Sequence, residues 1–180
     1  VKDPAVKGMW CVPKYSNPLG ITYSDETVKR IAALKPTAKD FRLMWDNAYA
    51  VHDLGEEGDK LLNIFDEAEK CGTLDRIFYF TSTSKITFPG AGVAMLAASP
   101  ANLKHISQFL GVQTIGYDKL NQFRHVKFYR DVRGIMNHMR LHRSILAPKF
   151  KAVVNEFNNQ LGGLGIATWT NPKGGYFISL

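Results

Sequence analysis

Short apolar runs alternate with helical segments along the first hundred residues of the chain. Strands are predicted where the runs are apolar and rich in β-branched or aromatic residues, at 7–12, 41–45, 76–80 and 93–98. Helices are predicted at 25–34, with Ser24 as the N-cap, and at 60–70, with Gly72 as the stop signal. The alternation of strand and helix predicts an α/β fold built on a largely parallel sheet.

The pattern becomes mostly helical after residue 99. A helix is predicted at 101–110, and most of the chain from 117 onward follows the same period, including a basic segment at 130–143. Pro148 either interrupts this segment or opens the next helix as a first-turn residue. The helix at 150–161 is amphipathic, with apolar side chains on one face.

Two further strands are predicted near the end of the sequence, at 165–169 and 175–180, joined by a turn rich in glycine. Because the character of the chain changes between residues 135 and 150, a domain boundary is expected there. The division is placed at 1–140 and 141–180.

Polar residues follow three of the predicted strands at the point where each strand ends. They are Asn17, Asp46 and the run at 82–85. Ligands of parallel α/β sheets gather beyond the carboxyl ends of the strands, so the topology brings these groups to one edge. Each group also has a plain structural interpretation: a turn for Asn17 and a helix cap for Asp46.

Lys85 stands in a run of small hydroxyl residues between two apolar strands. An ammonium group is costly to desolvate, so a buried position would depress its pKa and suit a nucleophilic amine. The alternative is a surface turn with an exposed lysine.

Three short motifs resemble those of fold-type-I aminotransferases. Ser82-Thr83-Ser84-Lys85, followed by Pro89-Gly90, resembles the family's Ser-x-Ser-Lys and glycine-rich run. Asp46-Asn47-Ala48-Tyr49 matches its Asp-x-x-Tyr, and Asn17-Pro18-Leu19-Gly20 resembles its Asn-Pro-Thr-Gly, with Leu19 in place of Thr. The motifs occur in the family's order and at about its spacings. The lysine loop is most similar to the divergent bacterial aspartate aminotransferase branch, sometimes grouped with MocR-like proteins.

The resemblance implies a role for each residue of the lysine loop. Lys85 would form an aldimine with pyridoxal 5'-phosphate and would later act as the base that moves the substrate α-proton. Ser82 would bind the cofactor phosphate, and Ser84 would orient Lys85 or assist it. Where other members have a phosphate-binding Arg, this chain has Gly92 and Val93, so backbone amides of the glycine-rich run would take that role.

The other two motifs would hold the cofactor ring. Asp46 would keep the pyridine nitrogen protonated, which makes the ring an electron sink. Asn17 and Tyr49 would hydrogen-bond the ring oxygen beside the imine. The segment 169–177 resembles a part of the family's small domain that lies near the substrate.

The fold implied by the resemblance is the three-layer α/β/α large domain of the fold-type-I pyridoxal-phosphate transferases, followed by the start of an α+β small domain. The chain covers about half of that fold. It lacks the family's upstream phosphate loop, its ring-stacking aromatic residue and its downstream substrate-binding Arg. We therefore expect a fragment of a longer enzyme, which as a whole would form a homodimer.

Composition excludes few classes of function. The net charge of +7 and the pI near 9.4 permit acidic partners, but the basic residues are spread out except at 138–143, so no nucleic-acid partner is expected. No apolar run reaches membrane-spanning length, and two isolated cysteines without a signal peptide suggest a cytoplasmic protein. His138 and His142 have the spacing of a metal pair but no third ligand nearby, so no metal is expected.

The main hypothesis is an aminotransferase that moves an amino group between an amino acid, expected to be aspartate, and a 2-oxo acid. One alternative is the effector-sensing, aminotransferase-like domain of a MocR-type transcriptional regulator. Another is an inactive fragment that binds no cofactor.

Overall fold

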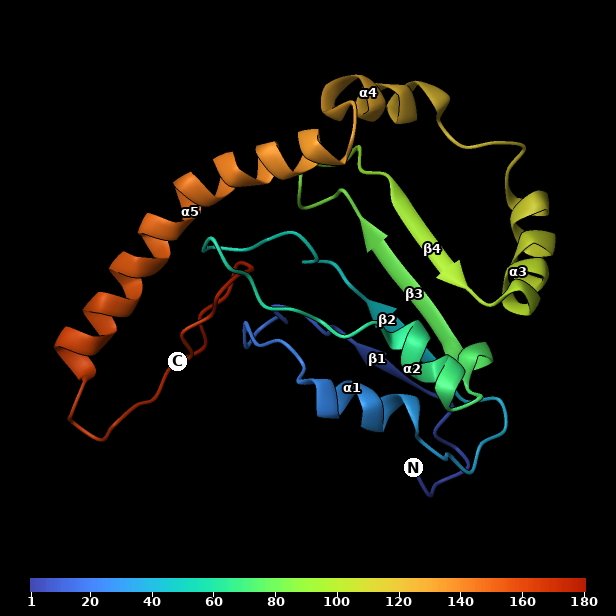
Figure 1. The fold of residues 1–180 in the computed structure, drawn as a ribbon, viewed down its shortest axis with the longest axis horizontal. Coiled ribbons are helices and arrows are strands. Elements are labelled where there is room, and N and C mark those ends of the chain that lie inside the picture. Colours follow the sequence, from blue (N-terminus) through green and yellow to red (C-terminus); the bar gives the residue numbers. More distant parts are fainter. The chain divides into compact units, whose positions relative to one another are not determined.

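The computed structural model describes residues 1–180 and has a mixed α/β architecture (Figure 1). One sheet contains four strands in the order of the sequence: β1 (Gly8–Cys11), β2 (Arg42–Asp46), β3 (Ile77–Ser82) and β4 (Ala94–Ala98). The first three strands are parallel, and β4 runs antiparallel to β3. The expectation of a largely parallel sheet is confirmed.

The helices are α1 (Asp25–Ala32), α2 (Ile64–Lys70), α3 (Pro100–Gln113), α4 (Lys119–Tyr129) and α5 (Val132–Leu161), with a short 3₁₀ turn at Leu74–Arg76. Side-chain caps set where most of them begin. Ser24 accepts from the backbone N–H of Thr27, as its sequence position predicts. The helix expected at 60–70 begins only at Ile64, because the side chain of Asn63 caps it by accepting from the N–H of Phe65.

Two expectations for the last third of the chain are wrong. The helix α5 runs for 30 residues straight through Pro148, so this proline neither ends a helix nor opens one. Pro148 removes one backbone donor from the helix interior, and the hydrogen bonds of the turns on either side continue the helix past it. The strands expected at 165–169 and 175–180 do not form. The two segments are joined only near Thr170 and Ser179: the N–H of Thr170 donates to the carbonyl oxygen of Ser179, and the N–H of Ser179 donates to the hydroxyl of Thr170.

The chain divides into two compact units, and each is described by itself. The first contains 1–12, 23–48 and 61–123, and the second contains 13–22, 49–60 and 124–180. The boundary expected at residues 140 and 141 falls inside α5. It stays a prediction about the domains of the longer fold.

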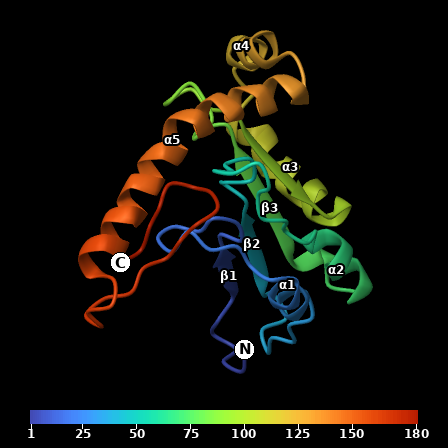
Figure 2. The same ribbon diagram turned by 60° about the vertical axis from the view of Figure 1, so that its left-hand side comes forward.

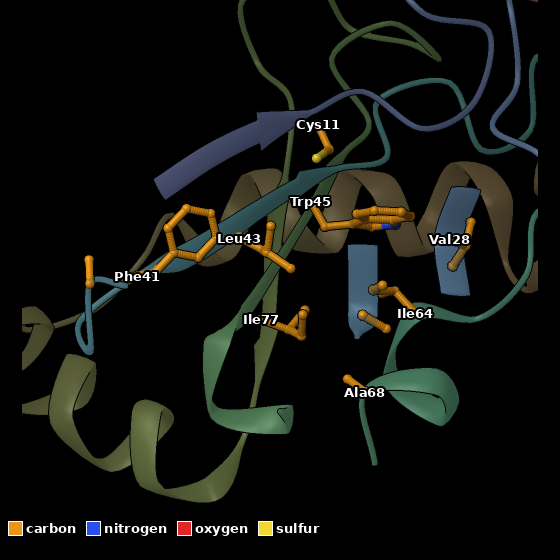
Figure 3. Packing of buried hydrophobic residues seen from close by; sticks show 10 residues of the cluster. Cys11, Val28, Phe41, Leu43, Trp45, Ile64, Ala68 and Ile77 are labelled. Carbon is orange, nitrogen blue, oxygen red and sulfur yellow. The ribbon is translucent and has the colours of Figure 1, made fainter. Parts of the chain in front are cut away.

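The core of the first unit lies between the sheet and two helices. Both α1 and α2 cover the same face of the sheet (Figure 2), and their apolar side chains meet those of the central strands (Figure 3). Every second residue of β2, Leu43 and Trp45, is buried in this cluster. The alternate residues of β2 point to the opposite face, because side chains alternate along a strand. Asp46 is one of these.

The two cysteines differ in environment. Cys11 is buried in this core, and burial raises the pKa of its thiol to about 11, against a smaller lowering effect of its hydrogen bond with Tyr23. Cys71 is exposed at the end of α2. No helix of the structure is both long enough and apolar enough to cross a membrane.

This difference predicts the reactivity of the thiols. The thiolate is the reactive form, so at pH 8 only about one Cys11 thiol in a thousand is ionised, and burial blocks the reagent as well. With a disulfide reagent at pH 8, we expect only Cys71 to react rapidly in the native chain, and both cysteines to react rapidly in urea. Cys71→Ser should remove the fast phase. Two equally fast thiols in the native chain would contradict the buried position of Cys11.

Candidate active site

In the first unit, Asp46 and the lysine loop leave the same end of the sheet. Asp46 is the last residue of β2 and pairs in register with Phe80 of β3. The backbone N–H of Asn47 donates to the carbonyl oxygen of Phe80 over 2.9 Å, and the hydroxyl of Thr81 donates to the carbonyl oxygen of Asn47 over 3.2 Å. These bonds fix the end of β2 against β3, two residues before Ser82. The alternative of Asp46 as a helix cap is wrong, because a turn and not a helix follows it.

The lysine loop is closed by a pair of hydrogen bonds at its base. The backbone N–H of Thr83 donates to the carbonyl oxygen of Val93, and the N–H of Val93 donates to the hydroxyl of Thr83, both over 2.9 Å. Inside the loop, the carbonyl oxygen of Thr83 accepts from the N–H groups of Ile86 and Thr87. From α4, the side-chain amide of Asn121 donates to the carbonyl oxygen of Ala91 over 2.8 Å. The loop is therefore held at its base and near the end of its glycine-rich run.

Close packing inside the loop requires glycine at position 92. A Cβ atom on Gly92 would lie 2.6 Å from the hydroxyl oxygen of Ser84, which is shorter than any ordinary contact. The backbone N–H of Ser84 points at the hydroxyl of Ser82 at 3.4 Å. Hydroxyl and backbone N–H groups thus gather at the turn that precedes Lys85.

The expectation that Lys85 is buried is wrong for this chain. Ser84 and Lys85 are both exposed, while Ser82 is half-buried. The loop connects β3 to β4, which are neighbouring antiparallel strands of one sheet. Because the loop projects beyond the end of both strands, neither strand covers it. Locally the loop is the exposed turn that the alternative interpretation predicted.

The second unit contains Asn17, which is exposed on a tight loop. The N–H of Ser16 donates to the carbonyl oxygen of Ile21 over 2.9 Å, and the N–H of Gly20 donates to the carbonyl oxygen of Ser16 over 2.6 Å. The Asn17–Pro18 peptide is cis. Gly20 has a φ of +68°, and a Cβ there would meet the carbonyl oxygen of Phe177 at 2.7 Å. The loop is thus packed against the C-terminal segment.

Tyr49 belongs to the same unit and is only 3% exposed. Its ring meets the rings of His52, Tyr176 and Phe177 edge-on, with centroids 5.6 to 6.1 Å apart. Burial is the main reason that the pKa of the Tyr176 phenol is raised, and nearby Tyr49 adds to it. Phe177 therefore contacts Tyr49 with its ring, and its carbonyl group packs against the Asn17 loop.

The six residues predicted from the sequence thus fall into two sets. Asp46, Ser82, Ser84 and Lys85 lie at or beyond the same sheet end of the first unit, and Asn17 and Tyr49 belong to the second. Sequence motifs did not indicate the residues that hold these sets in place, among them Thr83 and Asn121. His138 and His142 have ring centroids 4.5 Å apart, and no group of three potential metal ligands is present.

The fold and these motifs define the class of protein. The structure matches the crystal structure of an aspartate transaminase of Corynebacterium glutamicum with a TM-score of 0.95 and 45% identity, over 99% of this chain and 42% of that one. It also matches a kynurenine aminotransferase of Pyrococcus horikoshii with a TM-score of 0.75 at 22% identity, over 96% of this chain and 40% of that one, which shows the same fold. The chain has the fold of the fold-type-I aminotransferases.

The particular family follows from the sequence comparisons. The family model described as aspartate aminotransferase matches residues 1–180, and the chain belongs to this family. It is 46% identical to an aspartate aminotransferase of Corynebacterium glutamicum over 100% of the chain. It is 49% identical, over 99% of the chain, to a Mycolicibacterium smegmatis protein named only provisionally as an aminotransferase. The chain spans 42% of the length of each relative.

Proposed function

We propose that the protein carrying this chain transfers an amino group between aspartate and a 2-oxo acid with the help of pyridoxal 5'-phosphate. The observation that carries the proposal is the placement of Asp46 and the lysine loop at one end of the sheet. Support for aspartate comes from the 46% identical relative that is named for it. Nothing in these relatives supports the alternative of a MocR-type regulator.

The donor set of the first unit fits this cofactor. A carboxylate suits a protonated ring nitrogen, hydroxyl and backbone N–H groups suit a phosphate, and a primary amine suits an aldehyde. Asp46, Ser82 and Lys85 supply these three kinds of group in that order. When bound, pyridoxal phosphate supplies an electron sink for the substrate carbon that loses its proton.

Each residue of the set then has a distinct task. Lys85 would hold the cofactor covalently and, once substrate displaces it, would take the α-proton as a general base. Asp46 would stabilise the positive charge on the ring nitrogen, and Ser82 would bind the phosphate. Asn17 and Tyr49 would each offer a donor to the ring oxygen, the Asn through its amide and the Tyr through its phenol. Ser84 would orient Lys85.

The homodimer also remains a proposal. Five large apolar side chains on α3 and the start of α4 are exposed: Leu103, Phe109, Val112, Leu120 and Phe123. Exposed apolar surface of this kind is typical of an interface. Both cysteines are free, which is consistent with the reducing cytoplasm that we propose as the location.

A coupled assay with aspartate and 2-oxoglutarate tests the function. The full-length protein that carries this chain should form oxaloacetate at an ordinary aminotransferase rate. The 180-residue chain alone should give no measurable turnover, because orientation of the reacting groups supplies much of the rate and the chain spans only 42% of its relatives.

Absence of transamination by the full-length protein with aspartate and with other amino acids would contradict the proposal. Turnover by the chain alone that Lys85→Ala abolishes would show that the chain is sufficient.

A further inference from the structure

One ion pair in the second unit, between the buried Lys14 and the partly buried Asp53, has no role in the proposed chemistry. Asp53 accepts a hydrogen bond from the phenol of Tyr15 over 2.7 Å and from the ammonium group of Lys14 over 3.0 Å. Lys14 is 7% exposed and Tyr15 is fully buried. Each other ion pair of the chain includes a side chain that is more than half exposed.

Two further hydrogen bonds belong to this network. Lys14 donates a second bond to the carbonyl oxygen of Ala50 over 3.0 Å. The phenol oxygen of Tyr15 accepts from the backbone N–H of Asp59 over 2.8 Å. Burial raises the pKa of the Tyr15 phenol strongly, with the hydrogen bond to Asp53 as the next cause, so Tyr15 remains a donor at all physiological pH. A satisfied polar network of this kind specifies one arrangement of the chain.

Asp53 lies where three separate segments meet. Next to it, the N–H of Leu54 donates to the carbonyl oxygen of Lys173, and the N–H of Gly175 donates to the carbonyl oxygen of His52, both over 2.8 Å. Gly174 packs directly on the ring of Tyr15, since a Cβ there would lie 2.1 Å from the ring. The carboxylate joins 13–22 to 49–60, and the backbone bonds of His52 and Leu54 with the packing of Gly174 on Tyr15 add the C-terminal segment.

Two of these segments carry the groups proposed to bind the ring oxygen. Asn17 follows Tyr15 by two residues, on the loop that the hydrogen bond between Ser16 and Ile21 closes. Tyr49 precedes Asp53 by four residues, and its ring is held by His52 and Phe177, which lie in the segments that Asp53 joins. Loss of the carboxylate would leave Lys14 as an uncompensated buried charge, and the segments would have to move apart to hydrate it.

We propose that Asp53 is a positioning residue that holds Asn17 and Tyr49 in place as donors to the ring oxygen of the cofactor. The inference rests on the proposed function. Donors to this oxygen stabilise its negative charge, and so they lower the pH at which the lysine–cofactor linkage loses its proton. The proton affinity of that linkage is thus set in part by a carboxylate that does not touch the cofactor.

The test is a spectroscopic pH titration of the full-length protein loaded with pyridoxal phosphate. Asp53→Asn and Tyr15→Phe should each raise the midpoint of the visible band change by on the order of one pH unit. Asp53→Glu should restore part of the shift. The matched control is Glu56→Gln, which removes an ion-paired carboxylate from the same segment and should leave the midpoint unchanged.

The outcomes separate this inference from the proposed function. A normal band in the wild type with unchanged midpoints in both Asp53→Asn and Tyr15→Phe would overturn the positioning role, even if turnover falls. If Asp53→Asn does not fold, the midpoint of Tyr15→Phe decides alone. Absence of a visible band in the wild type would overturn the proposed function and this inference with it.

Discussion

Lys85→Ala lowers the transamination rate of the full-length protein by on the order of 10⁴-fold or more, because the amine serves both as the nucleophile and as the base. The expectation depends on the loop that carries it. Thr83 and Val93 close that loop at its base, and Asn121 holds its glycine-rich run. The backbone contacts do not involve the lysine side chain, so folding should be unaffected.

Two matched variants separate catalysis from charge. Lys85→Arg keeps the positive charge but offers no free amine, so its rate should be as low as that of the alanine variant. Lys104→Ala removes another exposed lysine, on α3, and should leave the rate unchanged. Steady-state rates with aspartate and 2-oxoglutarate give the comparison. A rate for Lys85→Ala within tenfold of wild type would remove Lys85 from the mechanism.

Asp46→Ala retains cofactor binding but lowers the rate roughly 10²- to 10³-fold, since one critical charge contact is typically worth a few kcal/mol in the transition state. The bonds that fix the end of β2 run through Asn47 and Thr81, so the backbone there does not depend on the carboxylate. Binding is measured by equilibrium dialysis of pyridoxal phosphate, and the rate by the coupled assay.

Conservative variants at the same position sharpen this result. Asp46→Asn keeps the shape and removes the charge, so it should resemble the alanine variant, whereas Asp46→Glu should recover part of the rate. Activity of Asp46→Ala within a few-fold of wild type would show that the carboxylate has no catalytic role.

The parts of the fold that the sequence predicted correctly are those determined by local pattern. The apolar, aromatic-rich runs at 41–45 and 76–80 identified β2 and β3, because strands at the centre of a sheet are built from such residues. The start of α2 was misplaced by four residues, since the apolar period extends through Leu61 and Leu62 but the cap is Asn63. Periodicity indicates which residues share a face, whereas caps decide where a helix begins.

Contacts between distant residues decided what the sequence could not predict. Two strands were expected near the C-terminus because the residues there are β-prone. A strand needs a run of backbone partners, and within 49–60 this segment has backbone bonds only to His52 and Leu54. Asp53 was overlooked for the same reason, since its partners Lys14 and Tyr15 lie 39 and 38 residues away. A motif records residues that are close in sequence, and a support network of this kind leaves no such record.

The position of Lys85 shows a different limit. Two apolar strands flank it in the sequence, which left burial and a surface turn as alternatives, and strands that neighbour each other in a sheet leave their connecting loop open. Its assignment rests on the order of three motifs and on the family to which the chain belongs. The surroundings of its side chain in this chain do not add to that assignment.

Borohydride reduction followed by peptide mapping tests the central claim most directly. The full-length protein is incubated with pyridoxal phosphate, reduced and digested, and the modified peptide is identified by mass spectrometry. We predict one pyridoxyl group, on Lys85, and its loss in Lys85→Ala. A pyridoxyl group on another lysine of the wild-type protein, with Lys85 unmodified, would contradict the account.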